Sequence, residues 1–451
     1  MIHRSLLGEL KLHLAEPEIT LIAGARQVGK TTLMNMLLEE LRKKDEKVLF
    51  LSLDFESDVP FFSTQQALIN RIKMEFGDQF GFVFLDEIQR KENAGLYLKG
   101  LYDMKLPVKF IISGSGSIEL KETIAESLAG RKRLFEVTPI TFNEFLNFRT
   151  HYNYEGKLPA YFRAYPDKIM ELFHEYLNFG GYPRVITAPT IKEKVLQINE
   201  IFQSYIDRDI RQLIRSDQPE AFVRVVRLLA AQTGQMLNLN NLSNDARVSA
   251  PTLQKHLWIA QKTYFIKMVE PYFKNVTKEI TKSPVVYFTD HGIRNFCISN
   301  FGNIQRHQDY GFVFQNLVGN ALLRELYATP FSVHYWRTTD KAEVDFVISR
   351  MNNPIGVEVK FSTLKSPVIT RSLRNFIEKY KPTEAWVVNL TFSGSTMIGT
   401  TKIRHITFFE LPDILHELVS SIEKLYMVEE RQFPYRIAGR VKKIKIKDIP
   451  M

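Results

Sequence analysis

The sequence is nearly free of cysteine, with Cys297 as its single thiol among 451 residues. One thiol cannot form a disulfide within the chain, so a disulfide-stapled fold is excluded and a reducing compartment fits best. We therefore interpret Cys297 as a small apolar side chain in a core.

Long apolar runs are absent as well. No stretch approaches the roughly 20 uninterrupted apolar residues that a membrane-spanning helix requires. The first residues do not resemble a signal peptide, because Glu9 and Lys11 interrupt a short apolar run. These features predict a cytoplasmic protein that does not associate with membranes.

Apolar side chains are nevertheless plentiful. Hydrophobic residues make up 45% of the chain and aromatic residues 12%, which is ample for packed cores. A chain of this length is expected to divide into several domains. Its net charge of +10 favours a polyanionic partner such as nucleic acid, although charge alone leaves contact with DNA open.

Short apolar segments alternate with helical patterns in the first part of the chain. The apolar segments are rich in β-branched residues and comprise residues 19–23, 48–53, 82–85 and 108–112. Amphipathic stretches at residues 32–43 and 65–76 lie between them. This alternation predicts an α/β domain over residues 1–150, in which helices cover both faces of a parallel sheet.

The pattern changes in the rest of the chain. Helical spacing of apolar residues predicts a helical linker over residues 151–235 and a winged-helix-like domain over residues 236–300. A helix followed by short strands predicts a second, smaller α/β domain over residues 301–425. Residues 426–451 form a basic tail, and we interpret its alternating lysines at 440–447 as a solvated face rather than a DNA-binding strip.

The first apolar segment runs into a phosphate-binding motif. From Gly24 to Thr31 the sequence reads Gly-Ala-Arg-Gln-Val-Gly-Lys-Thr, the G-x-x-x-x-G-K-T (Walker A) pattern, in which glycines let backbone N–H groups face phosphates at a helix start. Lys30 is expected to reach the β- and γ-phosphates of ATP, and the Thr31 hydroxyl to coordinate Mg²⁺. The predicted nucleotide-binding residues are Gly24, Ala25, Arg26, Gln27, Val28, Gly29, Lys30, Thr31, Thr32 and Ser113.

An acidic (Walker B) motif follows at a suitable distance. The apolar segment 82–85 ends in Asp86 and Glu87. Carboxylates at the carboxyl end of a buried strand lie beside the ligand in open α/β sheets. Asp86 is therefore expected to hold Mg²⁺, and Glu87 to orient or deprotonate the attacking water. Together the two motifs predict an enzyme that hydrolyses ATP.

Two further positions are candidates for the same site. Ser113 ends the apolar segment 108–112 and is predicted to sense the γ-phosphate, with an ordinary serine turn as the alternative. Arg131 is predicted to stabilise charge in the transition state as an arginine finger, with a plain surface arginine as the alternative.

Four motifs in this order resemble the AAA-superfamily ATPases of bacteria and archaea that carry a DUF4143 domain. They read Gly-Ala-Arg-Gln-Val-Gly-Lys-Thr-Thr, Phe-Leu-Asp-Glu-Ile-Gln, Ile-Ser-Gly-Ser and Leu-Ala-Gly-Arg, and the chain departs from the family at Ala25, where proline is usual. The resemblance covers nearly the whole chain, since residues 180–183 and 205–210 are typical of the family's linker. It implies the roles given above for Lys30, Thr31, Asp86, Glu87 and Arg131, with Ser113 or Ser115 as sensor.

Residues 239–257 have the spacing of a helix-turn-helix. A turn near residue 248 separates two helical patterns, and Thr252, Gln254 and Lys255 are expected to be exposed on the second. Residues 264–272 would then supply the wing. A plain helical hairpin that packs against protein is the alternative.

The last α/β segment contains Asp345, and then Glu358 and Lys360 on one face of the next strand. This pattern resembles the PD-(D/E)XK nuclease fold, in which Asp345 and Glu358 would hold Mg²⁺ and Lys360 would help to activate water. The preceding helix has Gln315 and Ala321 where the family usually carries glutamates. An active nuclease and a degenerate domain that binds DNA or a protein both remain open.

The sequence therefore predicts an ATPase that uses ATP and Mg²⁺ to switch a DNA-associated C-terminal domain. Two alternatives are a nucleotide-gated signalling protein that recruits a protein partner and an ATP-dependent nuclease. The oligomeric state is left open.

Overall fold

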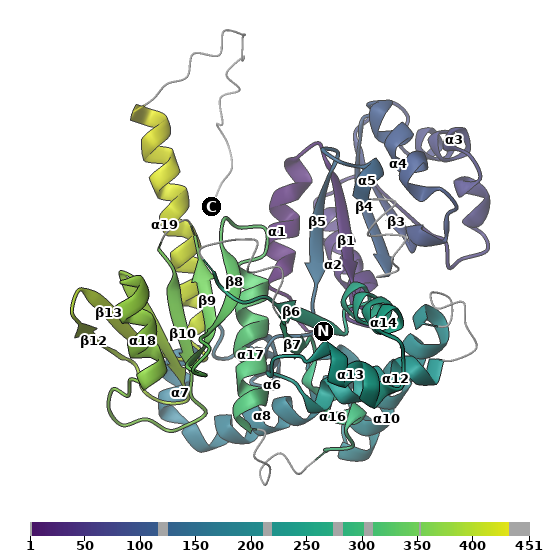
Figure 1. Cartoon of the computed structure of the whole chain (residues 1–451). Helices are drawn as coiled ribbons and strands as arrows, with labels where there is room; N and C mark the ends of the chain where they lie inside the picture. Colours follow the sequence, from purple (N-terminus) through teal and green to yellow (C-terminus); the bar gives the residue numbers. More distant parts are fainter. Residues whose placement is uncertain are drawn as a thin grey trace.

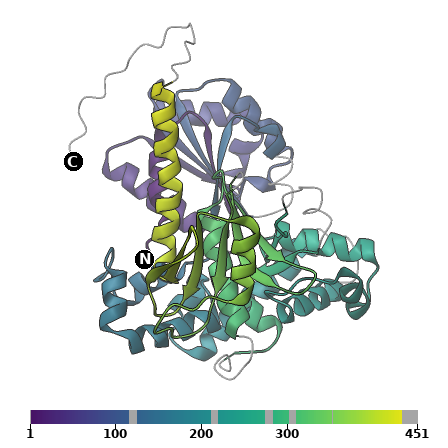
Figure 2. The ribbon, with the colours of Figure 1, turned by 60° about the vertical axis from the view of Figure 1, so that its left-hand side comes forward.

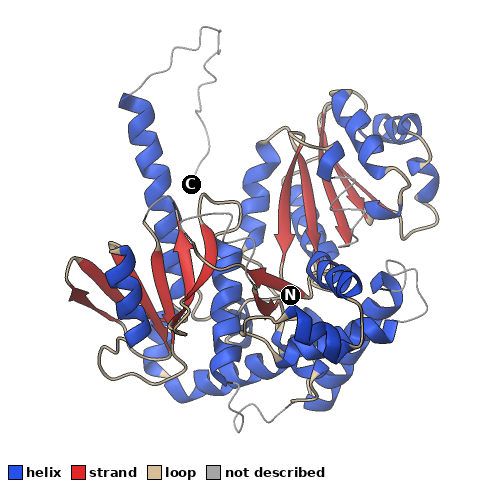
Figure 3. Ribbon diagram, viewed as in Figure 1, coloured by secondary structure: helices blue, strands red, loops and turns tan. Residues whose placement is uncertain are grey.

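The computed structural model describes residues 2–115, 125–210, 219–273, 283–301, 310–350 and 353–432. The two larger β-sheets lie apart from each other, and helices fill the space below and between them (Figure 1). Figure 3 shows the strands of both sheets in red within this helical surround.

The N-terminal sheet has the strand order β2-β3-β4-β1-β5, and all of its strand pairs are parallel. Its strands are β1 (Ile19–Gly24), β2 (Val48–Ser52), β3 (Gly81–Asp86), β4 (Val108–Ser115) and β5 (Lys132–Val137). Both β1 and β3 are buried at every position, as expected for parallel strands that are covered on both faces.

Helices cover both faces of this sheet, so the predicted architecture is confirmed. Leu33 and Leu37 of α2 pack with Ile22 and Phe84 on one face, whereas Leu68 of α3 belongs to the core on the other face. The helices of this part are α1 (Leu6–Leu12), α2 (Lys30–Lys43), α3 (Gln65–Phe76), α4 (Ala94–Asp103) and α5 (Ala125–Ser127), with short 3₁₀ turns η1 (His13–Ala15), η2 (Val59–Phe62) and η3 (Ile88–Arg90).

The middle of the chain is largely helical. Its helices are α6 (Phe142–Arg149), α7 (Leu158–Ala164), α8 (Pro166–Phe179), α9 (Pro183–Thr187), α10 (Ile191–Ser204), the π-helical segment η5 (Tyr205–Ile210), α12 (Pro219–Ala231), α13 (Leu239–Ala246), α14 (Ala250–Lys262) and α16 (His291–Cys297). Strands β6 (Ile266–Val269) and β7 (Val285–Phe288) form an antiparallel pair after α14. Side chains of α10, α12, α13 and α14 continue the core that α2 forms under the N-terminal sheet.

The expected linker over residues 151–235 is not one unit. Phe162 of α7 and Phe173 of α8 pack against Phe408 and Phe409, beyond the C-terminal sheet. At its other end, α12 packs with α13 and α14 and so joins the unit expected to begin at residue 236. Apolar helix faces bury themselves against whichever core is near in space, and helical periodicity does not reveal which core that is.

The C-terminal sheet is mixed, with the order β12-β13-β11-β10-β9-β8. Pairs β10–β11 and β11–β13 are parallel and the others antiparallel. Its strands are β8 (Ser332–Arg337), β9 (Glu343–Ser349), β10 (Ile355–Val359), β11 (Glu384–Asn389), β12 (Gly394–Ile398) and β13 (Thr401–Thr407). The predicted second α/β domain is therefore confirmed as a mixed sheet with helices.

Helices cover both faces of this sheet too. Phe314 and Val318 of α17 (Tyr310–Glu325) lie in the core on one face, and Leu373 and Phe376 of α18 (Arg371–Tyr380) lie in the core on the other. The last helix, α19 (Leu411–Gln432), stands along one side of the molecule (Figure 2). The lysine alternation at 440–447 lies outside the described residues.

Cys297 ends α16 with its thiol buried, and burial raises its pKa to about 12. The interpretation of this residue as a core side chain is therefore confirmed. Within the described ranges, no helix combines the length and the apolar character that crossing a membrane would need.

Candidate functional site

The glycines of the predicted phosphate-binding loop each meet a steric requirement. Gly29 has a φ of +96°, which a residue with a side chain rarely adopts, and it directly precedes α2. A Cβ at Gly24 would lie 2.3 Å from the carbonyl oxygen of Val137 on the neighbouring strand. Close packing against the neighbouring strand therefore requires a glycine at position 24, and the left-handed backbone conformation favours one at position 29.

Lys30 and Thr31 begin α2 at the carboxyl edge of the sheet. The Lys30 side chain is buried, and its Nζ donates to the carbonyl oxygens of Gly24 at 3.2 Å and Ala25 at 2.7 Å. The Thr31 hydroxyl donates to Asp86 Oδ2 at 3.1 Å. A cation and a hydroxyl therefore lie together at the positive end of a helix, where anions are stabilised.

Asp86 lies at the end of β3 and is 4% exposed. Its other carboxylate oxygen, Oδ1, accepts a hydrogen bond from the Ser113 hydroxyl, and Ser113 Oγ in turn accepts from the backbone N–H of Glu87 at 3.4 Å. Ser113 is therefore a buried partner of the acidic motif rather than part of an exposed turn. The side chain of Ser115 lies outside the described residues.

Glu87 adopts a left-handed backbone conformation, with a φ of +54°. Side chains other than glycine pay a steric cost there, and such residues gather at functional sites. Its carboxylate accepts a hydrogen bond from Gln89 Nε2. Sequence reasoning did not give Gln89 a role, although it stands in the Phe-Leu-Asp-Glu-Ile-Gln motif.

Arg131 is a correction to the prediction. Its carbonyl oxygen accepts from the N–H of Ile19, which places it where β1 begins, whereas the phosphate-binding loop follows the end of β1. At ~3.3 Å per residue the two edges of the sheet are more than about 15 Å apart. The exposed Arg131 guanidinium pairs with Asp103 at 2.7 Å, so it does not approach the loop of its own chain.

The remaining loop residues face other parts of the chain. Ala25 and Val28 are buried, whereas Thr32 is exposed on α2. Gln27, at a φ of +59°, donates from Nε2 to Ser204 Oγ at 3.2 Å and accepts from Arg184 at 3.4 Å. The loop is therefore in contact with the helical region.

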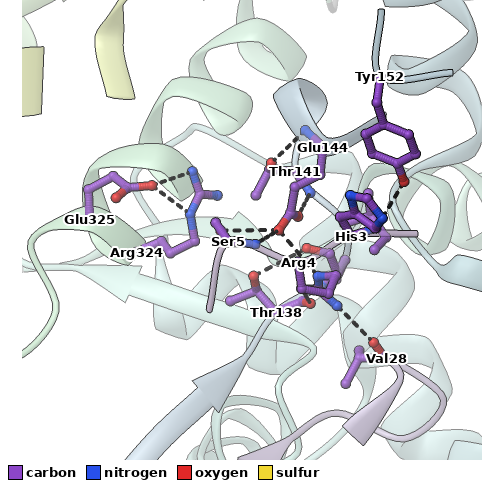
Figure 4. A network of polar contacts seen from close by, with 12 residues as sticks. His3, Arg4, Ser5, Val28, Thr138, Thr141, Glu144, Tyr152, Arg324 and Glu325 are labelled. Carbon is purple, nitrogen blue, oxygen red and sulfur yellow. Dashed lines mark hydrogen bonds and ion pairs between the residues drawn. The ribbon is translucent and has the colours of Figure 1, made fainter. Parts of the chain in front are cut away.

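A buried ion pair that sequence reasoning missed holds the back of the loop (Figure 4). Arg4 donates to the carbonyl oxygens of Val28 at 3.1 Å and Thr138 at 2.7 Å, and its Nε lies 3.3 Å from Glu144 Oε1. Backbone N–H groups of Ser5 and Thr141 each donate to Glu144 at 2.8 Å. The N-terminal segment therefore connects the loop to α6.

The Glu144 carboxylate is stabilised in its ionised form. Burial opposes ionisation, but the Arg4 guanidinium and the backbone N–H groups of Thr141 and Ser5 outweigh it, so the pKa of Glu144 lies below its usual value. Arg324 of α17 adds to this effect from the C-terminal domain. Arg4 and Glu144 are 140 positions apart, so no local sequence pattern predicts that they form an ion pair.

The C-terminal candidates are also brought together. Phe346 pairs with Val357 across β9 and β10, which places Asp345 beside Glu358. Asp345 Oδ2 accepts from the N–H of Val359 at 2.7 Å, and Lys360 Nζ lies 2.7 Å from Glu358 Oε1. Among the described residues, Glu358 Oε2 is buried without a hydrogen-bond partner.

Two carboxyl groups of this cluster, those of Asp345 and Glu343, have raised pKa values. Burial, followed by the neighbouring Glu358, raises the pKa of Asp345, and burial raises the pKa of Glu343. Gln315 donates to the Tyr287 hydroxyl at 3.0 Å. Within the described part of the chain, no group of three or more histidine, cysteine, aspartate or glutamate side chains is arranged to hold a metal ion.

Three parts of the chain match known protein families. Residues 16–146 match the family described as an AAA domain. Residues 170–303 match a domain of unknown function, DUF8612, and residues 310–407 match another, DUF4143. The segment that matches the AAA family includes every predicted nucleotide-binding residue, whereas Arg4 and Arg184 lie outside it.

Full-length relatives are similar over most of the chain. An uncharacterized protein of Mycobacterium tuberculosis is 25% identical over 375 residues, which cover 82% of this chain and 76% of that one. An uncharacterized protein of Haemophilus influenzae is 25% identical over 374 residues, which cover 80% and 87%. One of Methanocaldococcus jannaschii is 24% identical over 377 residues, which cover 79% and 78%.

Solved structures give weaker likenesses. AMPPCP-bound DnaA from Aquifex aeolicus has a TM-score of 0.23 at 16% identity, over 57% of this chain and 86% of that one. Cdc6p from Pyrobaculum aerophilum has a TM-score of 0.28 at 11% identity, over 63% and 91%. Because both TM-scores are low, nothing further is inferred from them.

Proposed function

We propose that this protein hydrolyses ATP with Mg²⁺ and that nucleotide turnover switches a C-terminal part that contacts DNA. The observation that carries the proposal is the convergence of Lys30, Thr31, Asp86 and Ser113 at the carboxyl edge of one parallel sheet, with Glu87 directly after Asp86. Ligands bind at this edge in open α/β sheets.

The residues present fit a nucleotide and its metal. The loop N–H groups and the buried Lys30 ammonium would hold the phosphates, while Thr31 and Asp86 offer the oxygen ligands that Mg²⁺ prefers. Mg²⁺, when bound, would neutralise charge on the phosphate oxygens. Glu87, with Gln89 fixing its carboxylate, would accept a proton from the attacking water.

We propose a winged helix for α12, α13, α14 and the β6–β7 pair. Support comes from the order of these elements and from the turn at Arg247, which has a φ of +55° before Ser249 caps α14. Gln254 and Lys255 are exposed on α14, as expected. Thr252 is half-buried instead, with its hydroxyl 2.8 Å from that of Ser249.

Contact with DNA is supported by the net charge of +10 and by the exposed face of α14. The test is ATP hydrolysis with and without duplex and branched DNA, beside Lys30→Ala and Glu87→Gln variants. We expect DNA to stimulate turnover in the wild type and in neither variant. Turnover that ignores DNA would overturn this part of the proposal and favour a switch that recruits a protein.

One observation favours an additional nuclease function. Buried Glu358 has an unpartnered carboxylate oxygen beside Asp345, and Lys360 is in contact with the same side chain. Asp345 and Glu358 would hold a divalent cation, and Lys360 would help to activate water. Gln315 in place of a glutamate leaves fewer acidic ligands, so activity is expected to be weak.

Cleavage of duplex DNA by the wild type and by Asp345→Ala tests the nuclease function. We expect Asp345→Ala to abolish cutting and to spare ATP hydrolysis, with exposed Glu378→Ala on α18 as a matched control. Cutting that persists in Asp345→Ala would exclude this site as the source.

A further inference from the structure

Residues 180–183 connect the phosphate-binding loop to the helical region. A Cβ placed on Gly29 would be 3.8 Å from Pro183 Cγ, so Pro183 packs over the last residue of the loop before α2. The carbonyl oxygen of Gly181 accepts from the N–H of Ile140, which follows β5, at 2.8 Å. This segment therefore contacts the part of the chain that matches the AAA family at two points, one of which is the loop itself.

The carboxylate of Asp290 holds the 180–183 segment from the other side. Its Oδ2 accepts from the N–H of Gly181 at 2.7 Å, and its Oδ1 accepts from the N–H of Ile293 in the first turn of α16 at 3.0 Å. A Cβ on Gly180 would lie 2.3 Å from the same Oδ1, so a glycine is needed for this close approach. One carboxylate therefore binds both the 180–183 segment and the start of α16.

Two other polar side chains of α16 bind the carboxyl ends of longer helices. Asn295 Nδ2 donates to the carbonyl oxygens of Leu177 at 2.8 Å and Asn178 at 2.9 Å, near the end of α8. Arg294 Nε donates to the carbonyl oxygen of Ala230 at 2.9 Å, near the end of α12. Both side chains are buried. A displacement of α16 is therefore expected to displace α12, which belongs to the unit proposed as a winged helix.

Stability does not account for the charge of Asp290. Burial raises the pKa of its carboxyl group to about 6, although the backbone N–H groups of Gly181, Ile293 and Gly292 oppose this shift. Because the folded pKa lies above the ordinary value of 3.8, ionisation at pH 7 makes the folded state less stable. Carboxylates that are buried in this way gather at functional positions.

We propose that Asp290 is a positioning residue that ties α16 to the phosphate-binding loop, so that nucleotide bound at the loop restrains α16. The inference rests on the proposed function, since it requires a nucleotide in the loop. Phosphates that order Gly29 also hold Pro183 in place, and Gly181 passes this restraint through the carboxylate to the first turn of α16. Arg294 extends the restraint to α12. Nucleotide binding is in this way linked to the unit that is proposed to contact DNA.

Cys297 provides a probe of α16. It ends this helix and is the only thiol of the chain, so its reaction with an aromatic disulfide reports the opening of α16. The thiol is buried and its pKa is raised to about 12, so it reacts slowly while α16 is in place. We expect a non-hydrolysable ATP analogue with Mg²⁺ to slow this reaction in the full-length wild type by about fivefold or more.

Two variants interrupt the connection at different points. Asp290→Asn keeps the shape of the side chain and removes its charge. Pro183→Ala removes the ring that packs over Gly29, and it tests the same connection if Asp290→Asn does not fold. In both variants we expect the analogue to slow the reaction of Cys297 by less than about twofold. Asp245→Asn, at an exposed position on α13, is the control and should respond as the wild type does.

The ratio of the two reaction rates, without and with the analogue, separates positioning from a merely structural role. A structural role would make Cys297 react faster under both conditions and leave the ratio unchanged. An unchanged ratio in Asp290→Asn, or in Pro183→Ala if the first variant does not fold, would overturn the inference and leave the nucleotide site standing.

Titration calorimetry of the analogue separates this inference from the proposed function. A wild type that binds the analogue without any change in the reaction of Cys297 would overturn the inference alone. Slowing that persists in Lys30→Ala would not originate in the loop and would also overturn it. A wild type that binds no nucleotide would overturn both the inference and the proposed function.

Discussion

Glu144 is a carboxylate inside the protein whose charge is matched by several donors. Arg4, Ser5 and Thr141 all point hydrogen-bond donors at it, and Arg4 also holds the backbone of Val28 (Figure 4). Removing one partner from such a pair leaves the other charge uncompensated. This residue therefore contributes to stability through its ionised form.

Glu144→Gln is expected to destabilise the protein by about 3 kcal/mol at pH 7, because the buried Arg4 loses its counter-charge. The folded pKa of Glu144 lies below its ordinary value of 4.5, so its contribution is present above pH 4.5 and is lost as pH falls through the folded pKa. The difference between wild type and variant should shrink on acidification.

Thermal unfolding of both proteins at pH 7 and below pH 4.5 checks this expectation. Glu171→Gln is the control, since that glutamate is 70% exposed in a pair with Lys168. An equal difference at both pH values would contradict the assignment of the stabilising charge to Glu144.

The sequence predicts the positions of some site residues in the structure but not of others. Lys30, Thr31, Asp86 and Glu87 stand in motifs whose spacing encodes the loop and the strand end, so their convergence follows from local chemistry. Arg131 directly precedes β5 and so lies at the sheet edge opposite the phosphate-binding loop, because a motif read along the chain does not show at which edge of the sheet it emerges.

At the scale of elements, α12 to α14 with β6 and β7 form one unit on the core beneath α2. Periodicity predicts its last two helices and an extended segment that includes β6, but it misses β7 and assigns α12 to a linker. The strand β5 is also missed, since only Phe135 and Val137 of this edge strand are buried and its residues do not form an apolar run. Burial on one face only is a weaker signal than burial on both.

If α14 contacts DNA, the loss of exposed cations on it and in the turn before it should weaken binding in a salt-dependent way. Lys255→Ala and Arg247→Ala are each expected to weaken duplex binding and to lower the slope of log K against log salt by about 1. Exposed Lys73→Ala on α3 is the control. Unchanged slopes in both variants would assign α14 to packing within the protein.

At the scale of the whole molecule, several interactions join residues 16–146 to the rest of the chain, and the following three are among them. Arg4 connects the loop to α6, whose neighbours belong to the C-terminal core. Lys267 of β6 lies 2.6 Å from Glu136 of β5. Gln27 contacts Ser204 of α10. A conformational change of the loop on nucleotide binding therefore has direct contacts through which to reach both the helical region and the C-terminal core.

Hydrogen exchange with and without an ATP analogue measures one of these routes. In the wild type we expect slower exchange in the loop and in α6. Arg4→Ala should keep the effect on the loop and lose the effect on α6, because the carbonyl of Val28 no longer connects to Glu144. Lys11→Ala, which removes an exposed pair with Glu40, is the control. An α6 response that persists in Arg4→Ala would exclude this route.

The sequence predicts two α/β domains and a helical region between them, but not their shared cores. Phe142 and Phe173 look like ordinary apolar helix positions, and their partner Phe408 is more than 200 positions away. Contacts between residues so far apart in the sequence do not affect its hydrophobic periodicity. The division of the helices between two cores can therefore be seen only in the structure.

We propose that Glu87, positioned directly after Asp86, promotes hydrolysis of ATP held by Lys30 and Thr31. The most direct test is phosphate release from Mg·ATP by wild type and Glu87→Gln, with binding of ATP measured in parallel. We predict steady turnover in the wild type and a loss of at least about 100-fold in Glu87→Gln, with binding retained. Turnover that is unchanged in Glu87→Gln would contradict the role of Glu87 in hydrolysis.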